Sequence, residues 1–222
     1  MLLNLVKLLS LFTVNLTSPS TSLTSISEFD MGHPNIRYAH DFLTGDGIVE
    51  RSGGALQSMT PEAASALIGN WAVETGSPNL TNLDVVEKNN NQAGRGISQF
   101  SHSRRGPYDA ARDAAINAGI DPNSIDFQLG YAIDEYTGKH DPEPGQSLSG
   151  WTKAFETYGQ SDDLAGATAG FQNDYFRPST PHADRRLEAA QRVHTFMTRP
   201  QPIDAMGNFN KIVDKFNNAM GN

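Results

Sequence analysis

The stretch TPEAASALIGNWAVETG, residues 60–76, carries the clearest structural signal in the sequence. Thr60 is a residue type that caps helices, and Pro61 suits the first helical position. Apolar side chains then recur at the three- and four-residue spacing of one helical face: Ala64, Leu67, Ile68 and Trp71. Gly76 is the residue type that most often ends a helix. The stretch therefore predicts a helix with one face buried in a core.

The same helical period recurs on both sides of this stretch. Six further segments have apolar residues at helical spacing and are expected to form helices: 36–43, 106–119, 124–136, 149–158, 164–175 and 181–197. Alternating patterns typical of strands are scarce, and the one place for a short β-hairpin is near residues 83–99. The predicted fold class is therefore all-α, with that hairpin as the one addition the pattern allows.

Length and composition limit the classes of protein that the chain can belong to. It has 222 residues, of which 37% are apolar, and this suits one compact domain with appendages. Its 25 acidic and 17 basic residues give a net charge of −8, which argues against nucleic acid as a partner. Cysteine is absent and the six histidines form no HExxH motif, so we expect no metal and no cofactor.

The predicted helices place one domain at residues 36–198, flanked by segments of different composition. Residues 17–35 begin with a nearly uncharged run rich in Ser and Thr, which is typical of a linker. Residues 199–222 contain Pro and Gly and then one apolar helical face, formed by Phe209, Ile212, Val213, Phe216 and Met220. An apolar face outside the core is expected to bury against a partner.

Residues 1–16, MLLNLVKLLSLFTVNL, are almost wholly apolar. A polar residue recurs at every third position of this segment, which predicts an amphipathic helix: Asn4, Lys7, Ser10 and Thr13. Membrane contact and a signal peptide are alternative interpretations, but the only charge lies inside the apolar run rather than before it. We favour a helix that docks to a partner protein.

The first candidate for chemistry is Glu74, which lies one turn after Trp71 and continues the apolar face of the 60–76 helix. A carboxyl at this position is expected to be partly desolvated, which disfavours its charged form and raises its pKa. A carboxylic acid that keeps its proton near neutral pH can protonate a departing glycosidic oxygen. The alternative interpretation is a solvated residue at a helix end with no catalytic role.

The second candidate is the turn at residues 93–100, AGRGISQF. Its two glycines let the backbone approach a ligand closely, Gln99 offers a donor and an acceptor, and Phe100 offers an apolar face to a sugar ring. A plain glycine turn is the alternative interpretation. Although aromatic residues at helical spacing more often belong to a core, three others could line the same cleft: Tyr131, Tyr175 and Phe176.

Five segments, in this order along the chain, resemble the phage tail lysozyme family, which is similar to goose-type lysozymes and soluble lytic transglycosylases. They are RYAHDFL at 37–43, ALIGNWAVETG at 66–76, GRGISQF at 94–100, QLGYAIDE at 128–135, and FRP at 176–178 with the pair Arg185–Arg186. The resemblance covers residues 36–198. The departures are long inserts at 49–57 and 77–92, which affect the loops but leave Glu74 in place.

The resemblance implies a lysozyme-like fold and, as substrate, the β-1,4 glycan of N-acetylmuramic acid and N-acetylglucosamine in peptidoglycan. Glu74 would be the catalytic acid, and the substrate-binding turn would be Gly96, Ile97, Ser98, Gln99 and Phe100. Tyr175 is added as a substrate-binding candidate because of its aromatic ring, not because of the resemblance. An inverting hydrolase would also need a second carboxylate, for which Asp84 and Glu87 are the candidates. A lytic transglycosylase needs none, because the sugar's own 6-hydroxyl attacks, and both reactions stay open.

The resemblance also implies a virion protein, carried in the tail or an internal core and acting in the host periplasm during genome delivery. The apolar faces at residues 1–16 and 199–222 and the acidic surface also favour a particle, in which these segments would bind other tail or core proteins and the chain would be oligomeric. Two other classes stay open: a tail component whose lysozyme-like domain is inactive, and a secreted bacterial enzyme that remodels the wall.

Overall fold

The computed structural model describes residues 33–87, 93–140 and 149–199, and these residues are mostly helical. The elements are α1 (Pro34–Thr44), α2 (Asp46–Arg51), α3 (Pro61–Thr75), the 3-10 turn η1 (His102–Arg104), α4 (Arg105–Asn117), α5 (Ile125–Tyr136), α6 (Ser149–Tyr158), α7 (Leu164–Gly170), the π-helical turn η2 (Phe171–Phe176) and α8 (Ala183–Thr198). The all-α prediction is confirmed. Of the hairpin expected at 83–99, the described residues show isolated antiparallel bridges, from Arg95 to Val86 and to Phe100.

Helix α3 begins and ends at the capping residues that the sequence predicted, Thr60 and Gly76. The Thr60 side chain accepts a hydrogen bond from the backbone N–H of Ala63 at 3.1 Å, and Pro61 opens the helix. Gly76 ends it in the left-handed conformation, with a φ of 61°. Eleven of its 15 residues are buried, so α3 is covered on most of its surface and forms the centre of the core rather than one side of it.

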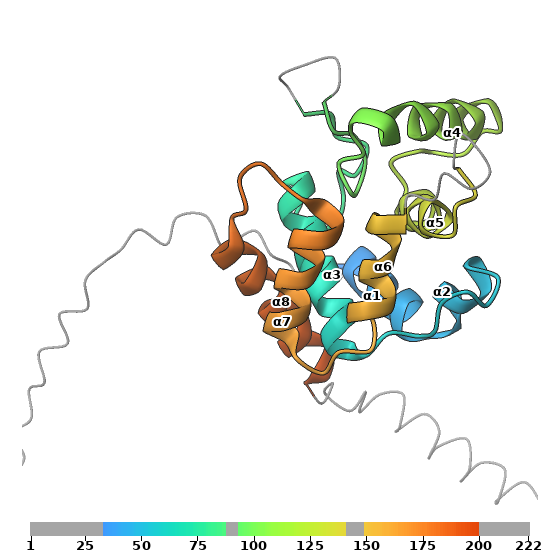
Figure 1. Ribbon diagram of the computed structural model, residues 1–222. Coiled ribbons are helices and arrows are strands. Elements are labelled where there is room, and N and C mark those ends of the chain that lie inside the picture. The colour runs from blue at the N-terminus through green and yellow to red at the C-terminus, as the bar shows by residue number, and fades with distance from the viewer. Residues whose placement is uncertain (1–32, 88–92, 141–148, 200–222) are drawn as a thin grey trace, which may run out of the picture.

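Helix α8 packs antiparallel along α3, which runs through the middle of the molecule (Figure 1). Three pairs of facing residues show this register: Glu62 with His194, Gly69 with Ala190, and Glu74 with Arg186. Helices α7 and α1 also pack against α3. As a consequence, the carboxyl-terminal end of α3 meets the amino-terminal end of α8.

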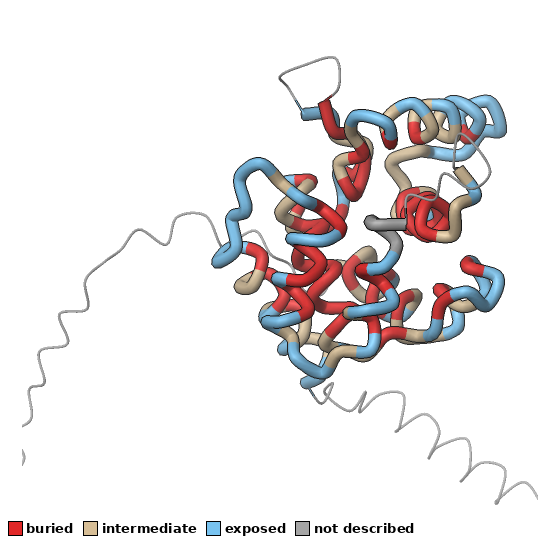
Figure 2. The backbone as a smooth tube through the Cα atoms, viewed as in Figure 1, coloured by how far each residue is buried: buried red, intermediate tan, exposed pale blue. Residues whose placement is uncertain are grey.

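Buried residues concentrate along α3 and α5, whereas the outer side of α4 and the loop before α8 are exposed (Figure 2). Helix α1 contributes Ile36 and Leu43 to the same core as Trp71 of α3 and Phe155 of α6. None of the helices in the described ranges is long and apolar enough to cross a membrane. The helices predicted at residues 1–16 and after residue 199 lie outside the described residues.

Three elements differ from the prediction. Helix α2 was not predicted, because six residues are too few for a helical period to show. The segment 164–175 is not one α-helix, since η2 follows α7 directly. The last helix begins at Ala183 rather than Pro181, because His182 adopts a left-handed φ of 49° that the helix cannot include.

Candidate active site

Glu74 lies in the last turn of α3, one turn after the fully buried Trp71. Its side chain is 13% exposed, and its Oε1 accepts a hydrogen bond from Nη2 of Arg186 at 2.6 Å. The carboxyl is therefore largely removed from water but still reaches the surface. This burial agrees with the place of Glu74 on the same face of α3 as Trp71.

Burial raises the pKa of Glu74 above its ordinary value, because it disfavours the charged form. Arg186 opposes this shift through its charge and its hydrogen bond, and Arg104 opposes it more weakly. The negative charge of Glu87 acts in the same direction as burial. Since burial prevails, Glu74 keeps its proton to a higher pH than an exposed glutamic acid, as a proton donor must.

A polar cleft of about 600 Å³ opens at Glu74. The last turn of α3 lines the cleft with Val73 and Glu74, and α8 adds Arg186 beside them. The segment between α3 and η1, with the start of η1, forms one wall through Val85, Val86, Glu87, Gln99, Ser101 and His102. The end of η2 and the segment before α8 form another through Phe176, Arg177, Pro178, Ser179, Thr180 and His182. Three parts of the chain that are distant in sequence therefore build one site.

Backbone strain concentrates around this cleft. Five non-glycine residues in the described ranges have left-handed φ angles, between 44° and 52°: Leu80, Gln99, His102, Arg177 and His182. All of these except Leu80 line the cleft. Such conformations cost about 1–3 kcal/mol each and cluster at functional sites. The strain therefore favours this cleft, independently of Glu74, as the active site.

Of the predicted substrate-binding turn, Gln99 lines the cleft, and its Nε2 donates to the backbone carbonyl of Gly96 at 3.0 Å. Ile97 and Phe100 are fully buried, and Ser98 is 2% exposed. Gly96, with a φ of 79°, packs so closely on Tyr108 that a Cβ would lie 2.7 Å from the ring. The turn thus shapes the wall of the cleft, and Gln99 is the side chain placed to touch a ligand.

The buried part of the turn belongs to a polar network that joins α3, η2, α5 and η1. Trp71 Nε1 donates to Ser98 Oγ at 2.9 Å, and the Tyr175 hydroxyl lies 3.1 Å from the same oxygen. That hydroxyl is also 3.2 Å from Glu135 Oε2, and Glu135 accepts two hydrogen bonds from Arg104 at 2.6 and 2.7 Å. Tyr175 is 1% exposed, so its hydroxyl fixes the turn from inside the core rather than facing a ligand.

The structure distinguishes the two candidates for a second carboxylate, because Glu87 lines the cleft and Asp84 does not. Asp84 accepts hydrogen bonds from Arg95, Arg112 and Tyr108 at 2.8–2.9 Å. Burial alone would raise the pKa of Asp84, but these donors together hold it below its usual value. A carboxylate committed to two guanidiniums is a poor base, so Glu87 is the better candidate.

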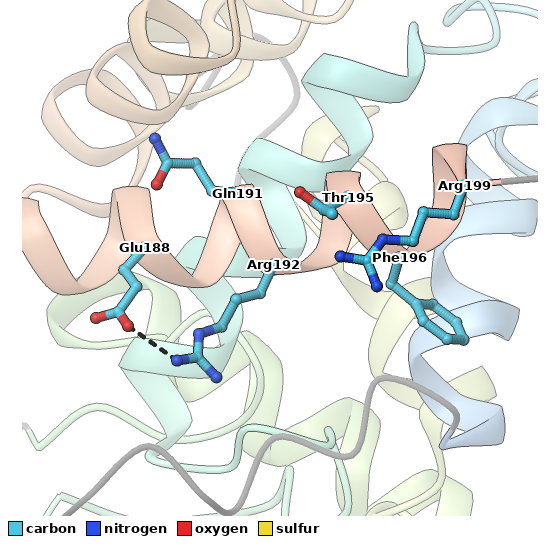
Figure 3. Close-up of a pocket in the computed structure, with 6 residues that line it drawn as sticks. All are labelled: Glu188, Gln191, Arg192, Thr195, Phe196 and Arg199. Atoms are coloured by element: carbon cyan, nitrogen blue, oxygen red, sulfur yellow. Dashed lines mark hydrogen bonds and ion pairs between the residues drawn. The ribbon is translucent and has the colours of Figure 1, made fainter. Parts of the chain in front are cut away.

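A second hollow of about 350 Å³ lies along α8 (Figure 3). The described residues that line it all come from this helix or its end: Glu188, Gln191, Arg192, Thr195, Phe196 and Arg199. Its one carboxylate, on Glu188, is 44% exposed and pairs with Arg192 at 3.1 Å. This hollow offers no sheltered proton donor, and we place the chemistry in the cleft at Glu74.

The sequence pattern did not identify four residues of the site: His102, Arg177, His182 and Arg186. Arg186 is 112 positions from Glu74, so no local spacing connects the two. The only signal was the Arg185–Arg186 pair within the motifs of the resemblance. His102, Arg177 and His182 all have a left-handed backbone, which non-glycine sequences do not reveal by a clear pattern, although Arg177 lies within the FRP motif of the resemblance.

An all-α domain with a sheltered carboxylic acid in a polar cleft has the arrangement of a lysozyme-type protein. A family model described as phage tail lysozyme matches residues 55–197, and the chain therefore belongs to the phage tail lysozyme family, as its motifs predicted. The matched range contains every residue that lines the cleft. No curated protein and no solved structure gives a match.

Proposed function

We propose that this chain is a virion-associated enzyme that cleaves the β-1,4 glycan of peptidoglycan, with Glu74 as its general acid. Membership of the lysozyme family supports peptidoglycan as the substrate class. The observation that carries the proposal is the location of Glu74: its carboxyl is mostly buried, has a raised pKa, and opens onto a cleft of about 600 Å³. An exposed carboxylate on a convex surface would not support a role as general acid.

In the first step, protonated Glu74 gives its proton to the glycosidic oxygen while the bond from that oxygen to the sugar's anomeric carbon breaks. The leaving sugar departs as a neutral alcohol, and the remaining sugar develops the positive charge of an oxocarbenium ion. Glu74 becomes a carboxylate, and the guanidinium of Arg186 at 2.6 Å then stabilises the charge that has formed. The raised pKa increases the fraction of Glu74 that carries a proton at a given pH.

The second step is completed by one of two nucleophiles. In a hydrolase, Glu87 would take a proton from a water that attacks the anomeric carbon, and its location in the same cleft supports this role. In a lytic transglycosylase, the sugar's own 6-hydroxyl attacks, gives its proton to the Glu74 carboxylate, and closes a 1,6-anhydro ring. Glu87 lines the same cleft as Glu74, and its negative charge acts to raise the pKa of Glu74, which supports the hydrolase.

Substrate binding in this proposal falls to the two walls of the cleft. The amide oxygen of Gln99 can accept a hydrogen bond from an N-acetyl N–H or a hydroxyl, while its Nε2 donates to the backbone carbonyls of Gly96 and Val85. The buried residues Ile97, Ser98, Phe100 and Tyr175 act indirectly, because they hold the wall that carries Gln99. A long polar glycan fits a polar cleft better than a compact apolar ligand would.

The products of digestion test this proposal. Purified protein is incubated with purified peptidoglycan, and the released fragments are analysed by mass spectrometry. Fragments that end in reducing N-acetylmuramic acid support the hydrolase, and 1,6-anhydro ends support the transglycosylase. No release of glycan fragments by folded protein would refute the proposal and leave a structural tail protein as the answer.

We also propose that the domain is carried in the virion tail or core and acts in the host periplasm; the family's description, phage tail lysozyme, supports the tail location. In this proposal residues 1–16 and 199–222 attach it to other virion proteins in an oligomeric arrangement, and residues 17–35 form the linker. The apolar faces of both terminal segments support an attachment role. Deleting residues 1–27 should abolish incorporation into particles while the isolated protein stays folded; particles that still contain the truncated chain would refute it.

A further inference from the structure

Arg186 is fixed at three points by hydrogen bonds from three of its nitrogens. Nε donates to the carbonyl of Pro181 at 2.7 Å, Nη1 donates to Oδ1 of Asn70 at 2.9 Å, and Nη2 donates to Oε1 of Glu74 at 2.6 Å. The guanidinium carbon also lies 5.7 Å from the centre of the Phe176 ring. A side chain held in this way has no freedom to rotate away from Glu74.

The burial of Arg186 makes these contacts obligatory. Its side chain is 2% exposed, and a guanidinium removed from water to this degree must find partners for its donors. Asn70 is fully buried as well, and its own Nδ2 donates to the carbonyls of Ala66 and Thr168. These two hydrogen bonds fix the Asn70 side chain with Oδ1 toward Arg186. Any other rotamer of Asn70 would break both of them.

The hydrogen bond from Arg186 engages one oxygen of the Glu74 carboxyl. Among the described residues, no donor forms a hydrogen bond with the other oxygen, Oε2. A proton on the carboxyl therefore belongs on Oε2, because Oε1 already accepts from a cation. The orientation of the carboxyl, and with it the direction in which Oε2 points, is set by Arg186.

We infer that Arg186 is the positioning residue of the acid: it holds Oε1 of Glu74 so that Oε2 carries the transferable proton toward the cleft. This inference rests on the proposed function of Glu74. Arg186 would not touch the substrate; it would act through the carboxyl alone. Asn70 and Pro181 support this role, since they accept hydrogen bonds from the two guanidinium nitrogens that do not bond Glu74.

The groups that influence Glu74 determine the direction of the expected change in pH dependence. They are Arg186 of α8, Arg104 of η1 and Glu87; Arg177, His102 and His182 line the same cleft. Arg186 lowers the pKa of Glu74 and the burial of the carboxyl raises it. Removal of the guanidinium therefore moves the loss of activity on the basic side to a higher pH.

The test compares Arg186→Gln and Arg186→Lys with Arg185→Gln, in which the neighbouring exposed arginine is changed in the same way. Glycan cleavage is measured across pH with the full-length protein, and circular dichroism reports folding. Arg186→Gln should lower kcat by about tenfold or more with KM changed by less than about twofold, and should move the basic limb to higher pH. Arg186→Lys should recover part of kcat, and Arg185→Gln should match wild type.

A double variant separates positioning from direct contact with substrate. If Arg186 acts only through the carboxyl, adding Arg186→Gln to Glu74→Gln should cause no further loss of rate.

Should Arg186→Gln fail to fold, Asn70→Ala, which keeps the guanidinium but removes one anchor, should still lower kcat with little effect on KM. A folded Arg186→Gln or Asn70→Ala enzyme with unchanged kcat would overturn the inference, as would an additive loss in the double variant. Such a result would refute only the role of Arg186. The proposed function would stand as long as wild type cleaves glycan and Glu74→Gln does not.

Discussion

Gly69 of α3 and Ala190 of α8 lie backbone against backbone: a Cβ added to Gly69 would be 2.5 Å from the backbone nitrogen of Ala190 and 2.7 Å from its Cα. Side chains cannot fit between the helices at this point. One turn further on, the same close approach brings Arg186 against Asn70 and Glu74. The distance between the two helices at Gly69 therefore determines whether the acid meets its guanidinium.

Gly69→Ala should destabilise the fold, although alanine normally favours a helix. The added methyl meets backbone atoms that can only move with the whole of α8, and such overpacking costs about 1–3 kcal/mol. Gly106→Ala is the matched control, because Gly106 is exposed in α4 and a Cβ there meets nothing within 4 Å. That change should alter stability by less than about 1 kcal/mol, because the helix preference of alanine is opposed by the restriction that Pro107 places on a non-glycine residue before it. Urea unfolding of both variants checks this, and equal stabilities would contradict the close approach of α3 and α8.

Asp84→Asn should reduce stability and make it less sensitive to acid. The carboxylate is 13% exposed and accepts from two arginines and a tyrosine, so its loss should cost about 2–3 kcal/mol near neutral pH. Because the folded-state pKa of Asp84 is lowered from 3.8, its contribution is present above that pH and is lost as the pH falls below about 4. Wild type and Asp84→Asn should therefore converge in stability in acid. If the variant lost catalysis while its stability at pH 7 stayed unchanged, Asp84 would be a catalytic base instead.

Glu135→Gln should destabilise the protein by about 3–5 kcal/mol, because it leaves the guanidinium of Arg104 buried without its carboxylate. Both side chains of the pair are 3% exposed, so water cannot replace the lost partner. Glu135→Leu combined with Arg104→Met should be less damaging than Glu135→Gln alone. Thermal unfolding of the three proteins checks this order, and a double variant less stable than the single one would show that the pair itself stabilises the fold.

His182→Gly should stabilise the protein and reduce activity. Glycine adopts the left-handed conformation of residue 182 without strain and is acceptable as a helix cap, so a gain of about 1 kcal/mol is expected. Activity should fall because an imidazole is removed from the wall of the cleft. Leu80→Gly provides the contrast: its φ of 52° is similar, but its side chain is fully buried, so that variant should be less stable. Destabilisation by His182→Gly would show that its backbone is not strained.

Much of the fold could be predicted from the sequence because its helix ends use local chemistry. The Ser124 side chain accepts from the N–H of Phe127, as the Thr60 side chain does from Ala63, and Gly76 takes the expected left-handed turn. These signals depend on residues within four positions of one another. Glu74 could be identified for the same reason, since its burial follows from its place on the face that contains Trp71.

The remaining parts of the site depend on contacts that no local pattern encodes. Ser98 was predicted to bind substrate, but its hydroxyl is occupied by Trp71 and Tyr175, which come from different elements. The sequence placed Asp84 in a loop with no evident partner, but in the structure it accepts a hydrogen bond from Arg112 of α4, which is 28 positions later in the chain. In each case a polar residue that resembled a ligand-binding group in sequence is satisfied by a distant partner within the fold.

The most direct test of the central claim is the rate at which Glu74→Gln releases soluble fragments from purified peptidoglycan, compared with wild type and Glu62→Gln. Glu62 is a matched control because it lies at the other end of α3 and pairs with His194 at 3.2 Å, far along the helix from the cleft. If Glu74 is the proton donor, its variant should be slower by about a hundredfold or more, while Glu62→Gln should keep nearly the full rate. A folded Glu74→Gln protein that releases fragments as fast as wild type would contradict the account.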